Sequence, residues 1–417
     1  MAGSSPQLLG VKKSFGFGDR LGLGTPGHIA AQRKYDFAPF FAQQSIQEMD
    51  GCGREPDEVI ASVRDAVEAA GFDGPWGANV EGLRSSGDVE RIDASGFTLF
   101  TIDPSKHIKP EAEDLPEGKV VGEVETLYTE GVFQTLDWDE RFLGERFYIG
   151  DKPFRFNRET LYRTALKYGR ALAHCETVAA SISAREGYGS YELETCFAGR
   201  GCPTSPEEHL FLALELKHRG IHIVGLAPGP PQAWECAIDL PEQMENVGEV
   251  LTAHAAIARR YGPYKLCFHH GSDKFRIYPA LGRACGELLH LKTSGTTYLE
   301  ALRVVFRADP DLFREILEHS CQHLPEPNGR IPISTTREEA IEAAGRMQTT
   351  SEVELFSEKA VRQALHTGCE AVLSRGKTNA GQPFKEAIRE ILEDRRDEYR
   401  QTLEEHFDRH FAALNAG

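Results

Sequence analysis

The chain has 417 residues, of which 40% are hydrophobic and 27% are charged, and its formal net charge is −17. This length accommodates one large domain or two ordinary ones. Nucleic acid is not expected as a partner, because phosphate binding needs clustered lysine and arginine and this chain is strongly acidic. An anionic substrate needs a local basic pocket that acts against the overall negative field.

The lack of recognisable targeting signals, together with the cysteine usage, indicates a reduced, cytoplasmic protein. No long stretch is continuously apolar, so we expect no transmembrane helix and no membrane partner. The first residues, MAGSSPQLLGVKK, lack a basic segment followed by an apolar run and are not expected to form a signal peptide. The nine cysteines include no C-x-x-C pair, which favours free thiols.

Short apolar runs alternate with longer segments of helical periodicity. Two weaker strand candidates come first, at residues 14–17 and 38–43. Five stronger candidates follow, at residues 96–103, 191–197, 221–228, 264–270 and 288–294. Buried strands separated by helices are typical of parallel sheets. The count favours a (β/α)8 TIM-like barrel whose eighth strand is not evident, with a doubly wound open sheet as the alternative.

Two segments break this alternation. Residues 104–155 are rich in proline, glycine and acidic residues, and we interpret them as an insertion after the third strand. Residues 325–417 are mostly helical and are expected to pack on the barrel as a C-terminal extension. We therefore predict a catalytic barrel domain over residues 1–324, followed by an extension that caps it or provides the interface of a homo-oligomer.

A glycine-rich segment, FGFGDRLGLGTPGHIAA, includes the end of the first strand candidate. Residues 22–27 fit the G-x-G-x-x-G pattern of dinucleotide-binding loops, and Glu48 or Asp50 lies where an acid that binds ribose is expected. The preceding segment is itself rich in glycine, so we favour a tight loop after a barrel strand. Its amides, together with Arg20, are suited to holding an oxyanion at a helix start.

Polar side chains recur near the carboxyl ends of the predicted strands, where barrel enzymes place their chemistry. Glu194, His269 and His290 are of this kind. Burying such groups costs several kcal/mol unless they are paired or bound to a metal. We therefore predict a site for one divalent ion, which zinc, manganese, nickel and iron would all suit, although each histidine alone could be structural. His270 has the opposite parity and is expected to face the helices.

Charged residues near the same strand ends are candidates for acid–base and binding roles. Lys274 and Lys292 lie beside the predicted barrel mouth, where lysines bind carboxylates or act as bases when burial lowers their pKa. Asp103 ends one strand and Asp273 follows another. Each of these two aspartates is either a catalytic group or the cap of the adjacent turn.

Seven segments are similar, in chain order, to those of a known family. They are SFGFGDRLGLGTPGH, FFAQQS, GPWGA, FTLFTIDPS, PTSPEEHLFLALELKHRG, HHGSDKFRIYP and LLHLKTSGTTYLEALR, and they run through most of residues 14–305. Together they resemble the tagaturonate epimerase family. The resemblance implies a metal-dependent barrel enzyme that interconverts tagaturonate and fructuronate in bacterial hexuronate catabolism. It places family-like residues at Asp19, Arg20, Gln43, Asp103, Glu194, His269, Asp273, Lys274, His290 and Lys292.

The chain departs from the family pattern beside the expected pocket. After Glu194 and Thr195 it reads CFAGRGC, and Leu193 stands where an acid is expected from the family. After LAP it reads GPPQAWECAID in place of a basic, aromatic segment, and position 270 is more often small in the family. These differences bear on the identity of the substrate more than on the type of reaction.

We expect a metal-dependent epimerase whose partner is a small keto sugar acid and which works by retro-aldol cleavage and aldol recombination. The expected catalytic residues are Asp273, Lys292 and Asp103, and the expected substrate-binding residues are Arg20, Gln43, Lys274, Thr293 and Ser294. Three alternatives stay open. They are a metal-dependent aldolase or isomerase acting on a related keto sugar or sugar acid, a non-catalytic sugar- or metal-binding protein, and a nicotinamide-dependent enzyme that uses the glycine-rich loop.

Overall fold

The computed structural model describes residues 5–93, 95–187, 189–199, 202–231, 234–242, 246–269, 271–327 and 332–417. At its centre, eight parallel strands form a closed barrel in the order β1-β10-β9-β8-β7-β4-β3-β2. They are β1 (Ser14–Gly18), β2 (Ala38–Ser45), β3 (Gly77–Leu83), β4 (Leu99–Ile102), β7 (Glu192–Cys196), β8 (Gly225–Ala227), β9 (Lys265–Phe268) and β10 (Leu289–Thr293). The predicted (β/α)8 barrel is therefore confirmed.

The strand that the sequence did not reveal is β3. Its sequence, GANVEGL, places glycine, asparagine and glutamate at alternate positions, so it lacks the apolar run of the other strands. Gly77 is needed there because a Cβ atom would collide with the ring of Phe40 on the neighbouring strand β2. Counting β3 corrects one prediction: segment 104–155 follows the fourth barrel strand, not the third.

Helices follow the strands and surround the barrel. They are α1 (Thr25–Gln32), α2 (Ile46–Cys52), α3 (Pro56–Ala69), α4 (Ser86–Arg91), α6 (Arg158–Glu186), α7 (Pro206–His218), α8 (Val247–Tyr261), α9 (Tyr278–Cys285) and α10 (Thr296–Ala308). Among the described residues, no helix combines the length and the apolar character that a membrane span requires.

Towards the amino ends of the strands, the barrel interior combines apolar side chains with the buried Lys265 of β9, whose Nζ donates to Ser14 Oγ at 3.2 Å. Towards the carboxyl ends it is charged. Leu9, Phe40 and Leu99 form a small buried cluster of their own, separate from the main core. The Phe40 ring stacks on the imidazole of His290, with ring centroids 4.9 Å apart. Polar side chains lie beyond this layer, and among them Glu194 is completely buried. The candidate site therefore rests on the ring of Phe40.

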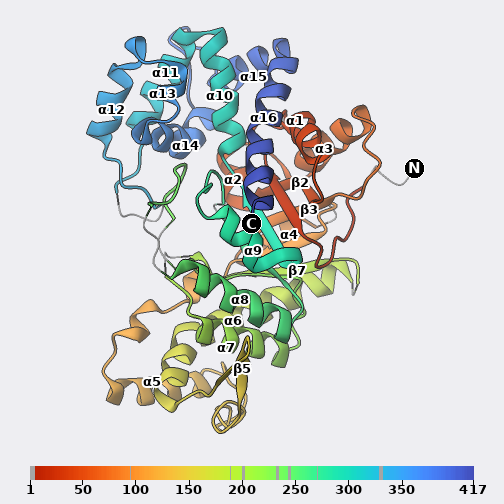
Figure 1. Cartoon of the computed structure of the whole chain (residues 1–417), viewed down its shortest axis with the longest axis vertical. Coiled ribbons are helices and arrows are strands. Elements are labelled where there is room, and N and C mark those ends of the chain that lie inside the picture. Colours follow the sequence, from red (N-terminus) through yellow and green to blue (C-terminus); the bar gives the residue numbers. More distant parts are fainter. Residues whose placement is uncertain are drawn as a thin grey trace.

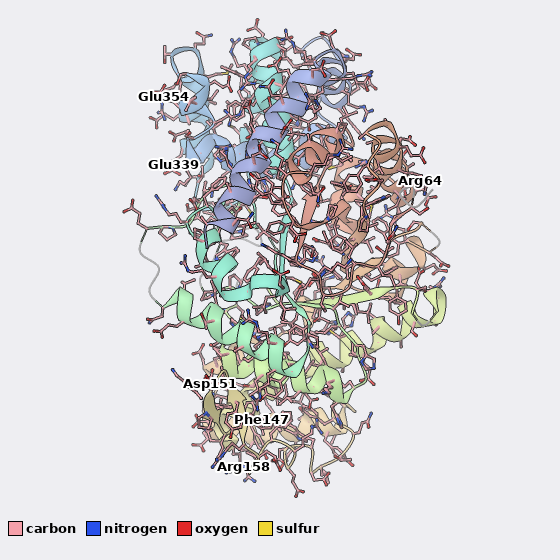
Figure 2. All side chains as sticks on the ribbon, turned by 45° about the vertical axis from the view of Figure 1, so that its right-hand side comes forward. Arg64, Phe147, Asp151, Arg158, Glu339 and Glu354 are labelled. Atoms are coloured by element: carbon pink, nitrogen blue, oxygen red, sulfur yellow. The ribbon has the colours of Figure 1, made fainter. Side chains whose placement is uncertain are left out.

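The segment 104–155 forms a lobe at one end of the molecule, at the bottom of Figure 1. It contains α5 (Glu117–Thr129) and an antiparallel hairpin of β5 (Phe147–Ile149) and β6 (Lys152–Phe154). The rings of Phe133 and Trp138 stack 4.1 Å apart inside this lobe. In Figure 2, Asp151 and Arg158 mark the lobe, whereas Glu339 and Glu354 mark the opposite end of the molecule.

The C-terminal extension is helical, and its last helix runs back to the barrel. Helix α11 (Pro310–Gln322) precedes it, and its own helices are α12 (Arg337–Gly345), α13 (Glu352–Leu355), α14 (Lys359–Ser374), α15 (Phe384–Asp394) and α16 (Arg396–Asn415). Figure 1 shows α16 descending from the upper helices to the centre of the molecule, where the chain ends. Its Phe411 packs on Phe15 of β1, with ring centroids 4.7 Å apart.

Candidate active site

Glu194 is the centre of a buried charged cluster inside the barrel. Its Oε1 accepts hydrogen bonds from Lys292 Nζ at 2.6 Å and, on the far side, from His269 Nε2 at 2.8 Å. Burial alone would raise the pKa of Glu194, but Lys292, His269 and His290 hold it well below its usual range. This buried carboxylate is therefore ionised, and β7, β10 and the end of β9 meet at it.

His290 and Glu194 offer buried atoms that lack partners. His290 Nδ1 lies 3.5 Å from Glu194 Oε2, yet among the described residues neither this oxygen nor either ring nitrogen of His290 has a hydrogen-bond partner. Burial lowers the pKa of His290 to about 3, so the ring is neutral at pH 7. The ligand atoms of Glu194, Cys267 and His290 lie within 4.8 Å of one another. A carboxylate, a thiol and a neutral imidazole so arranged fit a divalent transition metal ion.

His269 reaches the same carboxylate from the end of β9. Its Nδ1 lies 3.7 Å from Glu81 Oε2, opposite the nitrogen that contacts Glu194. Burial alone would lower the pKa of His269, but the neighbouring Cys196 and Glu81 raise it to about 10. The ring is therefore protonated in this arrangement, and a metal ion at Nε2 would displace that proton. His270, which was expected to face the helices, lies outside the described residues.

Lys292 connects Glu194 to the strand that the sequence did not reveal. Its Nζ lies 2.9 Å from Glu81 Oε1 and donates to Asn79 Oδ1 at 2.7 Å, both on β3. Burial alone would lower the pKa of Lys292, but Glu194 and Glu81 outweigh burial and raise it. Lys292 is therefore an ammonium ion that balances two carboxylates, and it is not a free base.

Asp273 lies in a second buried cluster, which the C-terminal extension completes. Its carboxylate pairs with Arg362 of α14 and lies 3.2 Å from His406 Nε2 and 3.4 Å from His410 Nε2 of α16. Burial alone would raise the pKa of Asp273, but His406 and Arg362 hold it well below its usual range. Asp273 thus contacts helices of the C-terminal extension, whereas Glu194 contacts residues of the barrel strands and their ends, although both residues lie near strand ends.

Lys274 and Asp103 are also engaged by neighbouring groups. Lys274 Nζ donates to backbone carbonyl oxygens, among them those of Glu235 at 3.0 Å and Ser272 at 3.3 Å. Burial lowers the pKa of Lys274. Asp103 pairs with Arg84 at 2.6 Å and accepts a hydrogen bond at 3.0 Å from the backbone amide two residues later. Asp103 therefore caps its turn, which is the alternative that its sequence position left open.

The glycine-rich loop is filled by a carboxylate of the chain itself. Asp19 Oδ1 accepts hydrogen bonds from the amides of Leu21 and Gly22 at 3.0 and 2.9 Å. Asp19 Oδ2 accepts a third from the amide of Gly24 at 2.7 Å. A dinucleotide or substrate oxyanion would need these same amides. The loop geometry therefore favours a tight structural turn over the nicotinamide alternative.

The other candidates for substrate binding lie around the end of β1. Arg20 pairs with Glu48 at 2.8 Å. Gln43 Nε2 donates to the carbonyl oxygen of Thr293 at 3.4 Å, while Gln43 Oε1 is buried and has no hydrogen-bond partner in the described part of the chain. The hydroxyl of Thr293 donates to a carbonyl oxygen of β1 at 2.8 Å, and the Ser294 amide donates to a neighbouring serine hydroxyl at 3.2 Å. Gln43 thus keeps an acceptor that a substrate hydroxyl could satisfy.

Three members of the Glu194 cluster were not predicted: Asn79, Glu81 and Thr101. The Thr101 hydroxyl lies 3.3 Å from Glu194 Oε1 and 3.2 Å from Lys292 Nζ. The sequence signal that could have revealed β3 is that Gly77, Asn79 and Glu81 occupy alternate positions. Residues at alternate positions share one face of a strand.

Comparisons with known proteins agree on one family. A family model described as tagaturonate epimerase matches residues 2–414. The tagaturonate/fructuronate epimerase of Thermotoga maritima is 31% identical over 409 residues, which cover 98% of this chain and 82% of that protein.

Solved structures give the same result. A glycerol complex of the fructuronate-tagaturonate epimerase from Cohnella laeviribosi matches with a TM-score of 0.90 and 29% identity, covering 99% of this chain and 83% of that one. The native structure of the same enzyme matches with a TM-score of 0.83 and 28% identity over 99% and 83% of the two chains. This chain therefore belongs to the tagaturonate epimerase family and is an epimerase, an enzyme of the isomerase class.

Proposed function

We propose that this enzyme interconverts tagaturonate and fructuronate and that it holds one divalent metal ion through Glu194, His269 and His290. The names of its relatives support the substrate pair. The set of buried atoms without partners on Glu194 and His290 supports the metal, and Cys267 is close enough to be a further ligand. Such an ion supplies Lewis acidity towards a carbonyl oxygen. Zinc, manganese, nickel and iron are all compatible with these donors.

We propose retro-aldol chemistry for the inversion. The two sugars differ at a carbon two bonds from the ketone, so the ketone does not acidify the hydrogen on that carbon. The same carbon carries a hydroxyl group β to the ketone, and this arrangement permits cleavage of the intervening carbon–carbon bond. The aldehyde fragment can then rotate and recombine through its other face.

Glu81 is the proposed proton carrier, and Lys292 is the proposed balancing charge. The Glu81 side chain is 14% exposed, whereas that of Glu194 is fully buried, so Glu81 is the more accessible of the two carboxylates beside Lys292. We infer that Glu81 takes the proton of the substrate hydroxyl and that Lys292 stays positive to balance the charge. Lys292 was expected to be a base and is now proposed as a fixed positive charge, and Glu81 replaces Asp273 as the proposed base.

A reducing compartment such as the cytoplasm is the proposed location. All nine cysteines are free thiols and eight of them are buried, which fits a protein that relies on no disulfide. The helical extension remains our candidate for an oligomer interface.

The test of this function combines metal removal with an isotope experiment. Dialysis against EDTA should abolish the conversion of tagaturonate to fructuronate, which is measured by NMR. One of the four candidate metals should restore the conversion. Substrate deuterated at the inverted carbon should show no primary isotope effect, and three-carbon fragments should accumulate slowly. A large primary effect, with nicotinamide recovered from the protein, would instead establish transient oxidation. Formation of fragments without any epimer would establish an aldolase.

Replacing Glu81 by glutamine is expected to lower kcat by about 100-fold, because the variant cannot accept the hydroxyl proton. The bound metal should stay at the wild-type level, since Glu81 is not a proposed ligand. The measurements are kcat by NMR and metal content by elemental analysis. Glu90→Gln, which changes an exposed carboxylate on the following helix α4, is the control. An unchanged kcat would restrict Glu81 to a structural role, and loss of the metal would make it a ligand.

A further inference from the structure

A cavity of about 530 Å³ lies between the barrel and the C-terminal extension. It is lined by the loop after β1, the turn between α2 and α3, and helix α15. It shares no lining residue with the cluster around Glu194. The proposed epimerase reaction therefore leaves this cavity without a role.

Three cationic side chains face this cavity: Arg54, Lys385 and Arg389. Backbone carbonyl oxygens hold all three in place. Lys385 Nζ donates to two of these oxygens, at 2.7 and 3.0 Å. Arg54 Nη1 and Arg389 Nη1 each donate to one, at 2.8 Å. The positive charges are thus gathered by neutral dipoles, which position them without neutralising them.

Two of these charges have no carboxylate partner in the part of the chain that the structure describes. No carboxylate oxygen lies within 4.0 Å of the charged nitrogens of Arg54 or Lys385, whereas Arg389 pairs with Glu393 at 3.4 Å. Arg54 is only 7% exposed, so its charge is also largely removed from water. A buried charge of this kind is costly unless a counter-ion is present.

The pKa values of Arg54 and Lys385 are lowered, because burial outweighs the influence of the carboxylates further away. Burial lowers the pKa of Arg54. Burial also lowers the pKa of Lys385, and the charges of Arg54 and Arg389 lower it further. Lys292, which is more deeply buried but lies between two carboxylates, has a raised pKa instead. Neither Arg54 nor Lys385 has a described carboxylate as close as the two beside Lys292.

We propose that this cavity binds a phosphate group, either as inorganic phosphate or as the monoester of a small metabolite. Two positive charges without partners match a phosphate dianion, whereas a single carboxylate would neutralise only one of them. The Ser62 hydroxyl also lines the cavity and holds the second nitrogen of Arg54, from which it accepts a hydrogen bond at 2.8 Å. Two exposed carboxylates at the same cavity, Glu58 and Glu386, limit the affinity by repulsion.

Phosphate bound there would connect α15 to the loop that follows β1. That loop carries Asp19 and Arg20, and Arg389 already donates to the carbonyl oxygen of Leu21 within it. Binding should therefore strengthen the contact between the barrel and its extension and raise the Tm of the whole protein.

The experiment measures binding of sodium phosphate and of glucose 6-phosphate to the full-length, metal-loaded protein, by calorimetry and thermal melting. Sodium chloride at equal ionic strength is the reference. Lys385→Met and Arg389→Gln should each weaken phosphate binding at least about tenfold, and Glu386→Gln should tighten it. Arg346→Gln is the matched control, because Arg346 is exposed, pairs with Glu342 and does not line the cavity.

Inorganic phosphate binding as tightly as the ester would identify free phosphate as the ligand, and tighter binding of the ester would identify a phosphorylated metabolite. The proposal fails if neither ligand raises the Tm beyond the chloride reference. It also fails if both cavity variants bind phosphate as the wild type does, since the anion would then sit elsewhere. No substrate is present in these measurements, so their outcome is independent of the epimerase assignment.

Discussion

Replacing Glu194 by glutamine is expected to abolish epimerase activity and to weaken metal binding by more than about 100-fold. Losing a group that only supports a ligand costs up to about 100-fold in metal affinity, and losing a ligand should cost more. The glutamine keeps the size of the side chain but removes the charge on which Lys292, His269 and His290 converge. Activity is measured by NMR with saturating metal, and metal affinity is measured by competition with a chelator.

The same substitution should also lower the free energy of unfolding. Breaking a buried ion pair typically costs about 3–5 kcal/mol, and the cost here should be smaller because Lys292 keeps Glu81 as a partner. Glu192→Gln is the matched control. Glu192 lies two residues earlier on the same face of β7, but its carboxylate accepts from the Gly10 amide instead of contacting Lys292. A Glu194→Gln protein that retains metal and activity would contradict the proposed site.

The ligand candidates could be predicted because barrel geometry makes strand ends informative. Each of Glu194, His269 and His290 is a polar residue that interrupts or ends an apolar run. In a strand, side chains two residues apart lie on the same face. The structure brings both histidines to the Glu194 carboxylate, with contacts of 2.8 and 3.5 Å, but the ligand atoms that lie within 4.8 Å of one another are those of Glu194, His290 and Cys267. Local sequence was sufficient here because parallel strands in a closed barrel necessarily end at the same rim.

The remainder of the cluster could not be found in this way. Asn79 and Glu81 occupy a strand whose inward face is polar, so the feature that makes them functional also hid the strand from a search for apolar runs. For the loop at Asp19, the sequence could not show that the amides are unavailable to an oxyanion, and the reason is different. A G-x-G-x-x-G pattern describes which backbone shapes are accessible, but not whether a carboxylate of the same chain already occupies the amides.

Contacts between distant parts of the chain were equally out of reach. Asp273 and His410 are 137 residues apart, and no local pattern pairs them. A position just after a barrel strand suggested a catalytic aspartate, whereas the contacts of Asp273 are with α14 and α16 of the extension. Whether Asp273 serves the reaction or the fold is therefore a question for substitution.

Asp273→Asn is expected to lower the free energy of unfolding by about 3–5 kcal/mol, because the change leaves the buried cations Arg362 and His406 without their shared carboxylate. The kcat of the protein that remains folded should stay within about tenfold of the wild type. Urea denaturation and NMR assays on the same preparation provide both values. Unchanged stability combined with a kcat more than 100-fold lower would restore the catalytic interpretation.

His406 makes this part of the structure sensitive to alkaline pH. Burial alone would lower its pKa, but Glu300 at 3.3 Å and Asp273 at 3.2 Å raise it from 6.5 to about 9, despite the nearby Arg409. A group whose pKa is higher in the folded state stabilises fully below its unfolded pKa, and this contribution disappears as pH rises through the folded value. The free energy of unfolding should therefore fall between pH 6.5 and 9, by on the order of 3 kcal/mol.

Comparing His406→Gln with the wild type isolates this contribution, because His269 also has a raised pKa and contributes equally to both proteins. The difference in the free energy of unfolding should be largest near pH 6 and should shrink steadily to its smallest value near pH 10, since glutamine carries no charge to lose. His410→Gln is the control: burial lowers the pKa of His410 to about 3, so that ring is neutral throughout this range and its replacement should cost the same at every pH. A difference for His406→Gln that did not change with pH would show that the imidazole is neutral in the folded protein and that Asp273 is held by Arg362 alone.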